Sequence, residues 1–165
     1  MGENFFPLPF GASAWRPGGR TAAGGGRCRL DTSEFSRSNS LLLLVVDDNL
    51  PSRYATVRLL SSAGYDVREA ATGAEALRLA RFDADLVLLD LRLPDLNGFD
   101  VCVRLKGDRR TAAVPVVMKT AVYGAEDDRR RGFACGASEY LTEPVPPTAL
   151  VAIVSRLLRR RTSHP

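Results

Sequence analysis

Residues 41–49 read LLLLVVDDN, and residues 85–90 read DLVLLD. Each is a short apolar run that closes on an aspartate, which is typical of a parallel strand buried on both faces. Amphipathic stretches with helical spacing separate such runs along the chain, and proline or glycine marks several of their ends. The runs predict strands at residues 41–46, 67–70, 85–90, 114–120 and 139–142, each followed by a helix.

This alternation predicts an α/β fold, a (βα)5 doubly wound parallel sheet with helices on both faces. In such a sheet the ligand site lies at the carboxyl ends of the strands. Acidic or hydroxyl side chains stand at four of those ends: Asp47 with Asp48, then Asp90, Thr120 and Glu143. Carboxylates that converge at one edge indicate a hard cation such as Mg²⁺, the usual partner of a phosphoryl group. A structural alternative is that each aspartate only caps the helix that follows it.

The length of 165 residues fits one folded domain with extensions. Periodic patterning begins abruptly at Leu41, so we expect one folded domain at residues 41–160 and a basic tail at 161–165. Residues 1–40 are rich in glycine and proline and predict a disordered or weakly ordered extension. An incorrectly assigned start site would explain them equally well.

Charge and composition argue against several functional classes of protein. The chain carries 23 basic and 19 acidic residues, but residues 41–155 hold 14 basic against 16 acidic, so we expect no direct nucleic-acid binding. The longest apolar run, six residues, predicts no membrane insertion. Three cysteines without CxxC spacing favour a reducing, cytoplasmic location. His164 is the one histidine, which leaves no internal imidazole for a catalytic triad or a zinc site.

Four segments together resemble the motifs of bacterial response-regulator receiver domains: VVDDN (45–49), DLVLLDLRLPDLNG (85–98), VPVVMKTA (114–121) and GASEYLTEP (136–144). The resemblance implies the flavodoxin-like strand order 2-1-3-4-5. It also implies that Asp90 is the phosphoacceptor, and that Mg²⁺ is bound by Asp48, Asp90 and the backbone carbonyl of Arg92.

The same resemblance assigns supporting roles. Asp47 would act as acidic support, Thr120 would donate its hydroxyl to a phosphoryl oxygen, and Tyr140 would be the aromatic switch. The partners implied are a histidine kinase or phosphotransfer protein and an unknown downstream protein. A homodimer through the fourth helix, fifth strand and fifth helix is a further expectation. Arg129, Arg130 and Arg131 on the fourth helix are interpreted either as part of that surface or as solvated residues in ion pairs.

Glu143 departs from the family, which has lysine at this position before the proline. Three interpretations stay open: Glu143 points to solvent, it pairs with Arg92, or it is an additional metal ligand. Lys119 is not expected to replace the missing lysine, because strand alternation aims it away from the face of Thr120.

The first functional hypothesis is a single-domain response regulator, a signalling component and not a dedicated enzyme. The second is a pseudo-receiver, a phosphorylation-independent interaction module, which Glu143 favours. A haloacid-type phosphatase is disfavoured, because the patterned region offers no substrate cap and no basic phosphate-binding residue.

Overall fold

The computed structural model describes residues 40–121 and 126–162. Most of the predicted extension at residues 1–40, and residues 163–165 of the predicted tail, lie outside the described residues. Within them, five strands and five helices alternate strictly along the chain. In order they are β1 (Leu42–Val46), α1 (Leu50–Ser62), β2 (Asp66–Ala70), α2 (Gly73–Ala80), β3 (Leu86–Asp90), α3 (Gly98–Gly107), β4 (Val116–Thr120), α4 (Glu126–Ala134), β5 (Glu139–Thr142) and α5 (Pro147–Thr162).

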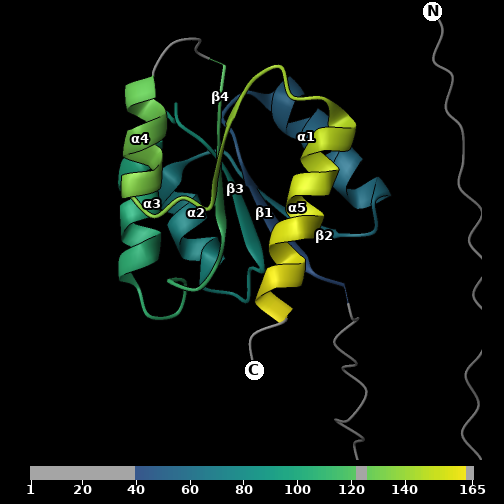
Figure 1. Cartoon of the computed structure of the whole chain (residues 1–165), viewed down its shortest axis with the longest axis horizontal. Helices are drawn as coiled ribbons and strands as arrows, with labels where there is room; N and C mark the ends of the chain where they lie inside the picture. Colours follow the sequence, from purple (N-terminus) through teal and green to yellow (C-terminus); the bar gives the residue numbers. More distant parts are fainter. Residues whose placement is uncertain (1–39, 122–125, 163–165) are drawn as a thin grey trace, which may run out of the picture. The chain divides into compact units, whose positions relative to one another are not determined.

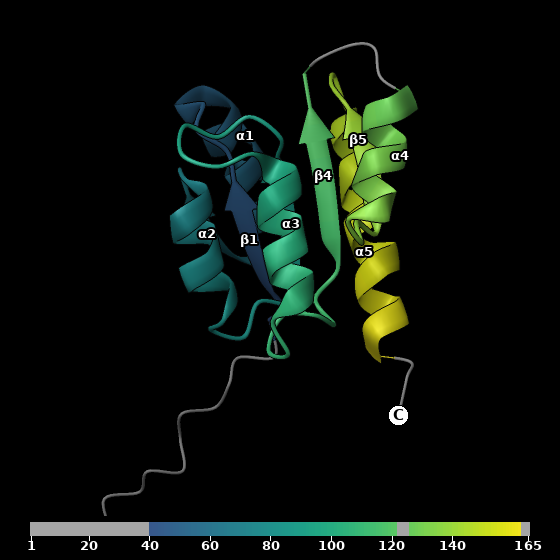
Figure 2. The ribbon, with the colours of Figure 1, turned by 90° about the vertical axis from the view of Figure 1, so that its left-hand side faces the viewer.

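All five strands are parallel and are ordered β2-β1-β3-β4-β5 across the sheet. The predicted α/β fold and strand order are therefore confirmed. Helices α1 and α5 cover one face, and α2, α3 and α4 cover the other (Figure 1). Figure 2 shows the second layer of helices from its own side.

Strand alternation divides the apolar side chains into two cores, one on each face of the sheet. In β1, Leu43 and Val45 pack in the core beneath α1 and α5, whereas Leu44 and Val46 pack in the core beneath α2 to α4. All four side chains are at most 1% exposed, so both faces of this strand are covered. The same alternation places the residues that follow each strand on a defined side of the sheet.

Polar side chains fix the first turns of α1 and α2. The Asn49 side chain accepts a hydrogen bond from Ser52 N at 3.0 Å, and the Thr72 hydroxyl accepts one from Glu75 N at 3.1 Å. The carboxylate of Asp95 accepts hydrogen bonds from the backbone N–H groups of Gly73 and Ala74, at 2.7 and 2.8 Å. These two bonds lower the pKa of Asp95. Asp95 therefore ties the loop after β3 to the start of α2.

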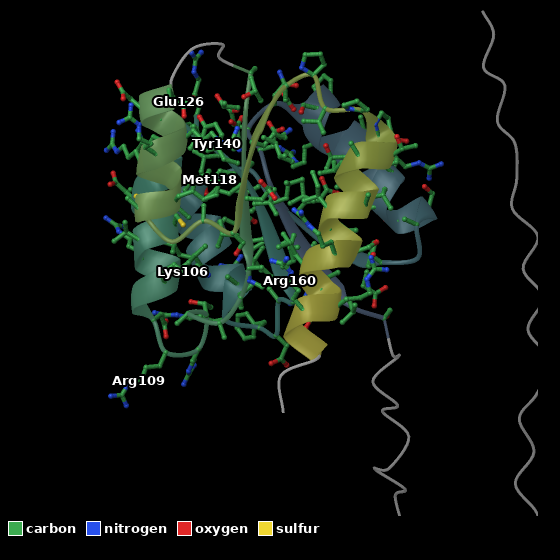
Figure 3. All side chains as sticks on the ribbon, in the orientation of Figure 1. Lys106, Arg109, Met118, Glu126, Tyr140 and Arg160 are labelled. Atoms are coloured by element: carbon green, nitrogen blue, oxygen red, sulfur yellow. The ribbon has the colours of Figure 1, made fainter. Side chains whose placement is uncertain are left out.

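Helix α4 approaches the sheet closely at Gly132. A Cβ at this position would lie 2.9 Å from the Tyr140 ring and 3.1 Å from Met118 Sδ. Figure 3 shows Met118 and Tyr140 beside α4. The missing side chain at Gly132 is what allows α4 to pack over β4 and β5.

None of the helices within residues 40–121 and 126–162 has the length and apolar character that crossing a bilayer requires.

We predict that Gly132→Ala destabilises the fold by about 1–3 kcal/mol, because the added methyl group overpacks the contact with Tyr140 and Met118. Gly107→Ala is the matched control. A Cβ there meets no atom within 4 Å, and alanine costs less backbone entropy than glycine in a helix. Urea unfolding of both variants measures the difference, and equal stability of the two would contradict this packing.

Candidate functional site

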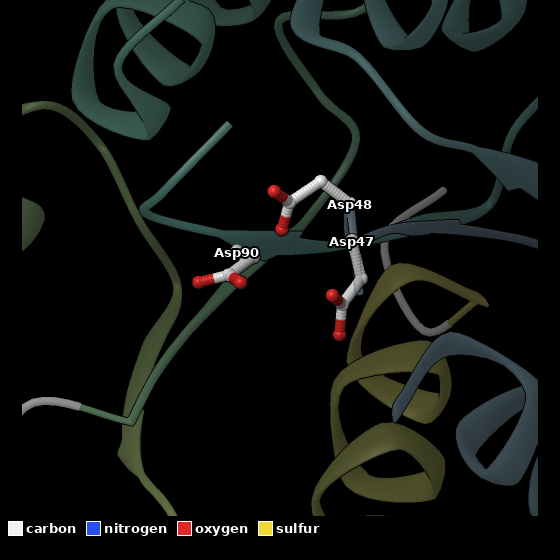
Figure 4. Close-up of side chains that lie close together, drawn as sticks. All are labelled: Asp47, Asp48 and Asp90. Carbon is white, nitrogen blue, oxygen red and sulfur yellow. The ribbon is translucent and has the colours of Figure 1, made fainter. Parts of the chain in front are cut away.

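Three carboxylates meet at the carboxyl edge of the sheet. Asp47 and Asp48 follow β1, and Asp90 ends the neighbouring strand β3. One oxygen from each carboxylate lies within 4.8 Å of the others, as Figure 4 illustrates. Asp47 is buried, Asp90 is half-buried and Asp48 is exposed, so the cluster opens to solvent on the side of Asp48.

The carboxylate of Asp47 is held by hydrogen bonds from several directions. Asn49 N donates to Oδ1 at 2.8 Å, and the Ser52 hydroxyl donates to Oδ2 at 2.7 Å. Lys119 Nζ also donates to Oδ2, at 2.8 Å. A buried carboxylate requires such donors, because an unpaired buried charge is very costly.

Lys119 lies in the site beside Asp47 and Glu143, although strand alternation does aim it away from the face of Thr120. Its side chain is 5% exposed, and Nζ lies 2.8 Å from Asp47 Oδ2 and 2.9 Å from Glu143 Oε1. Lys119 and Thr120 leave β4 on opposite faces, as expected. Whether Lys119 lies in the site depends instead on its neighbour Asp90 on β3. Asp90 and Lys119 are register partners on β3 and β4, so their side chains leave the sheet on the same face.

Glu143 pairs with Lys119, a partner that none of the three sequence interpretations of this residue names. Its side chain is 33% exposed and does not simply point to solvent. Its cationic partner is Lys119 and not Arg92. The cluster with metal-binding geometry within the described residues consists of the three aspartates, without Glu143. The backbone N–H of Glu143 donates to Thr120 O at 2.8 Å, which holds this residue against the end of β4.

The other predicted site residues lie around this cluster. Thr120 ends β4 and is 3% exposed. Arg92 is exposed, and its backbone N–H lies 3.3 Å from Asp90 Oδ1. A Cβ on Gly98 would lie 2.6 Å from the backbone oxygen of Asp90, so the loop after β3 can return over Asp90 only with glycine there.

Tyr140, the predicted switch residue, is 8% exposed and packs in the core beneath α4. Burial raises the pKa of its phenol, and the charge of Asp128 adds to this effect. On α4 itself, Arg130 pairs with Asp127 at 3.2 Å, and the guanidinium of Arg131 lies over the ring of Phe99. The pair of Arg130 and Asp127 agrees with the interpretation of these arginines as solvated residues in ion pairs, whereas Arg131 contacts α3.

The surroundings of Asp90 oppose ionisation of its carboxyl group. Burial raises the pKa of Asp90, and the charge of Asp47 raises it further. The hydrogen bond from Arg92 N and the charge of Lys119 act in the opposite direction, but the net shift is upward. For Lys119, burial lowers the pKa, and its bonds to Asp47 and Glu143 outweigh burial, so its pKa is raised.

The donor set suits a hard divalent cation. All three clustered side chains offer carboxylate oxygens, which Mg²⁺ prefers, and two of the three remain accessible. Asp47 is buried and already accepts three hydrogen bonds from protein donors. Asp48 and Asp90 are therefore the side chains that fit the ion best.

The family model described as "Response regulator receiver domain" matches residues 43–155, which contain every site residue discussed above. The chain belongs to the response-regulator receiver family. Over 125 residues it is 42% identical to the "DNA-binding dual master transcriptional regulator RpaA" of Synechocystis sp., covering 75% of this chain and 51% of RpaA. It is also 35% identical over 117 residues to "Protein PilH" of Pseudomonas aeruginosa, covering 70% of this chain and 96% of PilH.

Solved receiver structures share the fold. A putative response regulator from Chloroflexus aurantiacus matches with a TM-score of 0.69 and 35% identity, over 73% of this chain and 99% of the other. The receiver domain of the sensor histidine kinase PA1611 from Pseudomonas aeruginosa matches with a TM-score of 0.67 and 29% identity, over 73% and 98% of the two chains. That structure has a magnesium ion coordinated in its active-site cleft. The present receiver spans about half the length of curated relatives such as RpaA.

We predict that Asp90→Asn stabilises the receiver at neutral pH without Mg²⁺. The raised pKa of Asp90 means that its ionised form opposes folding. The protonated Asp90 carboxyl contributes favourably to stability at low pH, and this contribution is lost as the pH rises through the folded-state pKa. Melting curves should therefore show a higher Tm for Asp90→Asn at pH 7, with a difference that narrows in acid.

Asp100→Asn is the control for this experiment. Asp100 is exposed in the first turn of α3, where its charge favours the helix. This substitution should lower the Tm slightly. A Tm of Asp90→Asn at or below that of the wild type at pH 7 would contradict the electrostatic description of the site.

Proposed function

We propose that this receiver accepts a phosphoryl group on Asp90 from a histidine kinase or phosphotransfer protein, and signals through contacts with another protein. The observation that carries the proposal is the cluster of Asp47, Asp48 and Asp90 at the carboxyl edge of the sheet. Membership of the receiver family supports it. The half-buried Asp90 is accessible to a donor, whereas the buried Asp47 is not.

In the proposed reaction a carboxylate oxygen of Asp90 attacks the phosphorus of a phosphohistidine. A P–O bond forms with the electron pair of the carboxylate, and the P–N bond breaks with its pair remaining on the imidazole nitrogen. The Thr120 hydroxyl is proposed to donate to a phosphoryl oxygen. Arg92 N, which already lies near Asp90 Oδ1, holds the acceptor in place.

Asp48, Asp90 and the backbone carbonyl of Arg92 are proposed to hold Mg²⁺. When bound, the ion would offset the negative charge that the carboxylates and the phosphoryl oxygens bring together. Asp47 would contribute through its charge and through its hold on Lys119. A neutralising ion would also favour the ionised, nucleophilic form of Asp90.

We propose a signalling component of the cytoplasm, with no separate substrate. The free thiols of Cys102 and Cys135 agree with a reducing compartment. A downstream protein, or a second copy of the receiver, would dock on the surface formed by α4, β5 and α5, close to Tyr140. We propose no direct contact of the described domain with nucleic acid.

A second candidate is a phosphorylation-independent interaction module. The observation that favours it is the additional carboxylate, Glu143, beside the aspartate cluster. In this case the acidic site would serve metal binding or stability alone. A failure of phosphorylation in the following experiment would support this alternative.

We predict that incubation with Mg²⁺ and acetyl phosphate adds a single phosphoryl group to the wild type and none to Asp90→Ala. A phosphate-affinity gel and intact mass measure the modification. Label on Asp90→Ala would contradict the acceptor assignment. An unmodified wild type at saturating donor would contradict phosphotransfer and leave the second candidate.

We also predict that Mg²⁺ raises the Tm of the wild type, because a ligand of the folded state stabilises it by mass action. The shift should be lost in Asp48→Asn. Asp95→Asn is the matched control, since Asp95 caps α2 outside the cluster and should leave the Mg²⁺-dependent shift intact. An unchanged shift in Asp48→Asn would contradict the proposed ligand.

A further inference from the structure

Lys119 is held in one position by a complete set of acceptors. A lysine ammonium carries three N–H donors. Nζ donates to Asp47 Oδ2 at 2.8 Å and to Ser52 Oγ at 2.9 Å, and it lies 2.9 Å from Glu143 Oε1. Each proton of this buried cation therefore has a partner.

The position of the ammonium relative to Asp90 follows from the sheet. Strand β3 lies between β1 and β4, so a contact from Lys119 on β4 to Asp47 after β1 passes across the carboxyl end of β3. Asp90 is the last residue of β3 and the register partner of Lys119. The cation thus lies beside the proposed phosphoacceptor.

Two of the three acceptors of Lys119 are carboxylates, and they differ in how easily another anion can take their place. The Asp47 side chain is 2% exposed, whereas the Glu143 side chain is 33% exposed at the rim. Water can solvate a released Glu143 carboxylate but not a released Asp47 carboxylate. An anion that arrives at Asp90 can therefore take over the bond of Glu143 at the lowest cost.

We propose that Lys119 is the phosphoryl-binding cation of this receiver, supplied from β4 in place of the lysine that the family has at the position of Glu143. This inference rests on the proposed phosphorylation of Asp90. In the unphosphorylated protein Glu143 occupies the third donor of Lys119. A phosphoryl oxygen on Asp90 displaces Glu143 and accepts the hydrogen bond from Lys119.

The test compares acetyl-phosphate labelling of the wild type with Lys119→Met, Lys119→Arg and Glu143→Gln, all with Mg²⁺. Losing a charge-assisted hydrogen bond to phosphate should lower the maximal labelling rate of Lys119→Met roughly tenfold or more. Lys119→Arg should recover part of that loss. Glu143→Gln should label faster than the wild type, because it removes a negative charge and weakens the competitor for Lys119.

Glu139→Gln is the matched control for Glu143→Gln. Glu139 begins β5, whereas Glu143 directly follows its other end, and Glu139 likewise pairs with a cation, Arg156. Its labelling should equal that of the wild type. Circular dichroism and Tm identify any variant that fails to fold.

Because Lys119→Met leaves Asp47 with a buried, less compensated charge, the double variant Lys119→Met/Glu143→Lys provides a second arm. It removes the ammonium from β4 and returns one at residue 143, directly after β5. We expect this double variant to be phosphorylated at least tenfold faster than Lys119→Met. If Lys119→Met does not fold, the double variant should still fold and become phosphorylated. Beryllofluoride is a phosphoryl analogue that binds without a phosphotransfer reaction. Its affinity, measured by calorimetry, should rank the variants in the same order as their labelling rates.

The outcomes separate this inference from the proposed function. A wild type that takes no phosphoryl group contradicts the proposed function. The role of Lys119 is contradicted if the wild type is phosphorylated and a folded Lys119→Met variant is phosphorylated, and binds beryllofluoride, equally well. Slower labelling of Glu143→Gln than of the wild type contradicts the displacement of Glu143.

Discussion

The ion pair between Lys119 and Asp47 is the contact on which the geometry of the site depends. It joins β4 to the end of β1 across β3, and it includes Ser52 of α1 and Glu143 after β5. Four segments are thereby held around the end of the strand that carries Asp90. A buried pair of this kind adds little net stability, because desolvation of both charges offsets their attraction. Its effect is to define positions, since removing either partner would leave the other charge buried and less compensated.

The remainder of the site follows from how the sheet ends. Parallel strands bring their carboxyl ends to one edge, so residues far apart in the sequence become neighbours there. Asp47 and Asp48 point to opposite sides of the chain (Figure 4), and one is used for the buried pair while the other stays exposed. Gly98 allows the loop after β3 to return over Asp90. Stability and the proposed function are opposed at Asp90, because attack on phosphorus would need the ionised form, which burial disfavours.

Much of the fold could be predicted from the sequence, because buried parallel strands are continuous apolar runs and the helices between them have clear first-turn signals. The aspartate cluster was predictable for the same reason, since each member directly follows or ends such a run. The position of Lys119 was not predicted, because alternation gives the face of a residue only relative to its own strand. The register between β3 and β4 pairs Asp90 with Lys119, and this pairing places both side chains on the same face of the sheet. The partner of Glu143 and the contact of Asp95 with α2 also depend on tertiary structure.

The most direct test of the central claim is a measurement on the Lys119 ammonium itself. The chain has two lysines, Lys106 and Lys119, so ¹⁵N-detected NMR of their side chains can be assigned with the variant Lys106→Arg. The account predicts that the Lys119 ammonium protons exchange slowly with water and show couplings across hydrogen bonds to the carboxyl carbons of both Asp47 and Glu143. A rapidly exchanging ammonium without these couplings would contradict it.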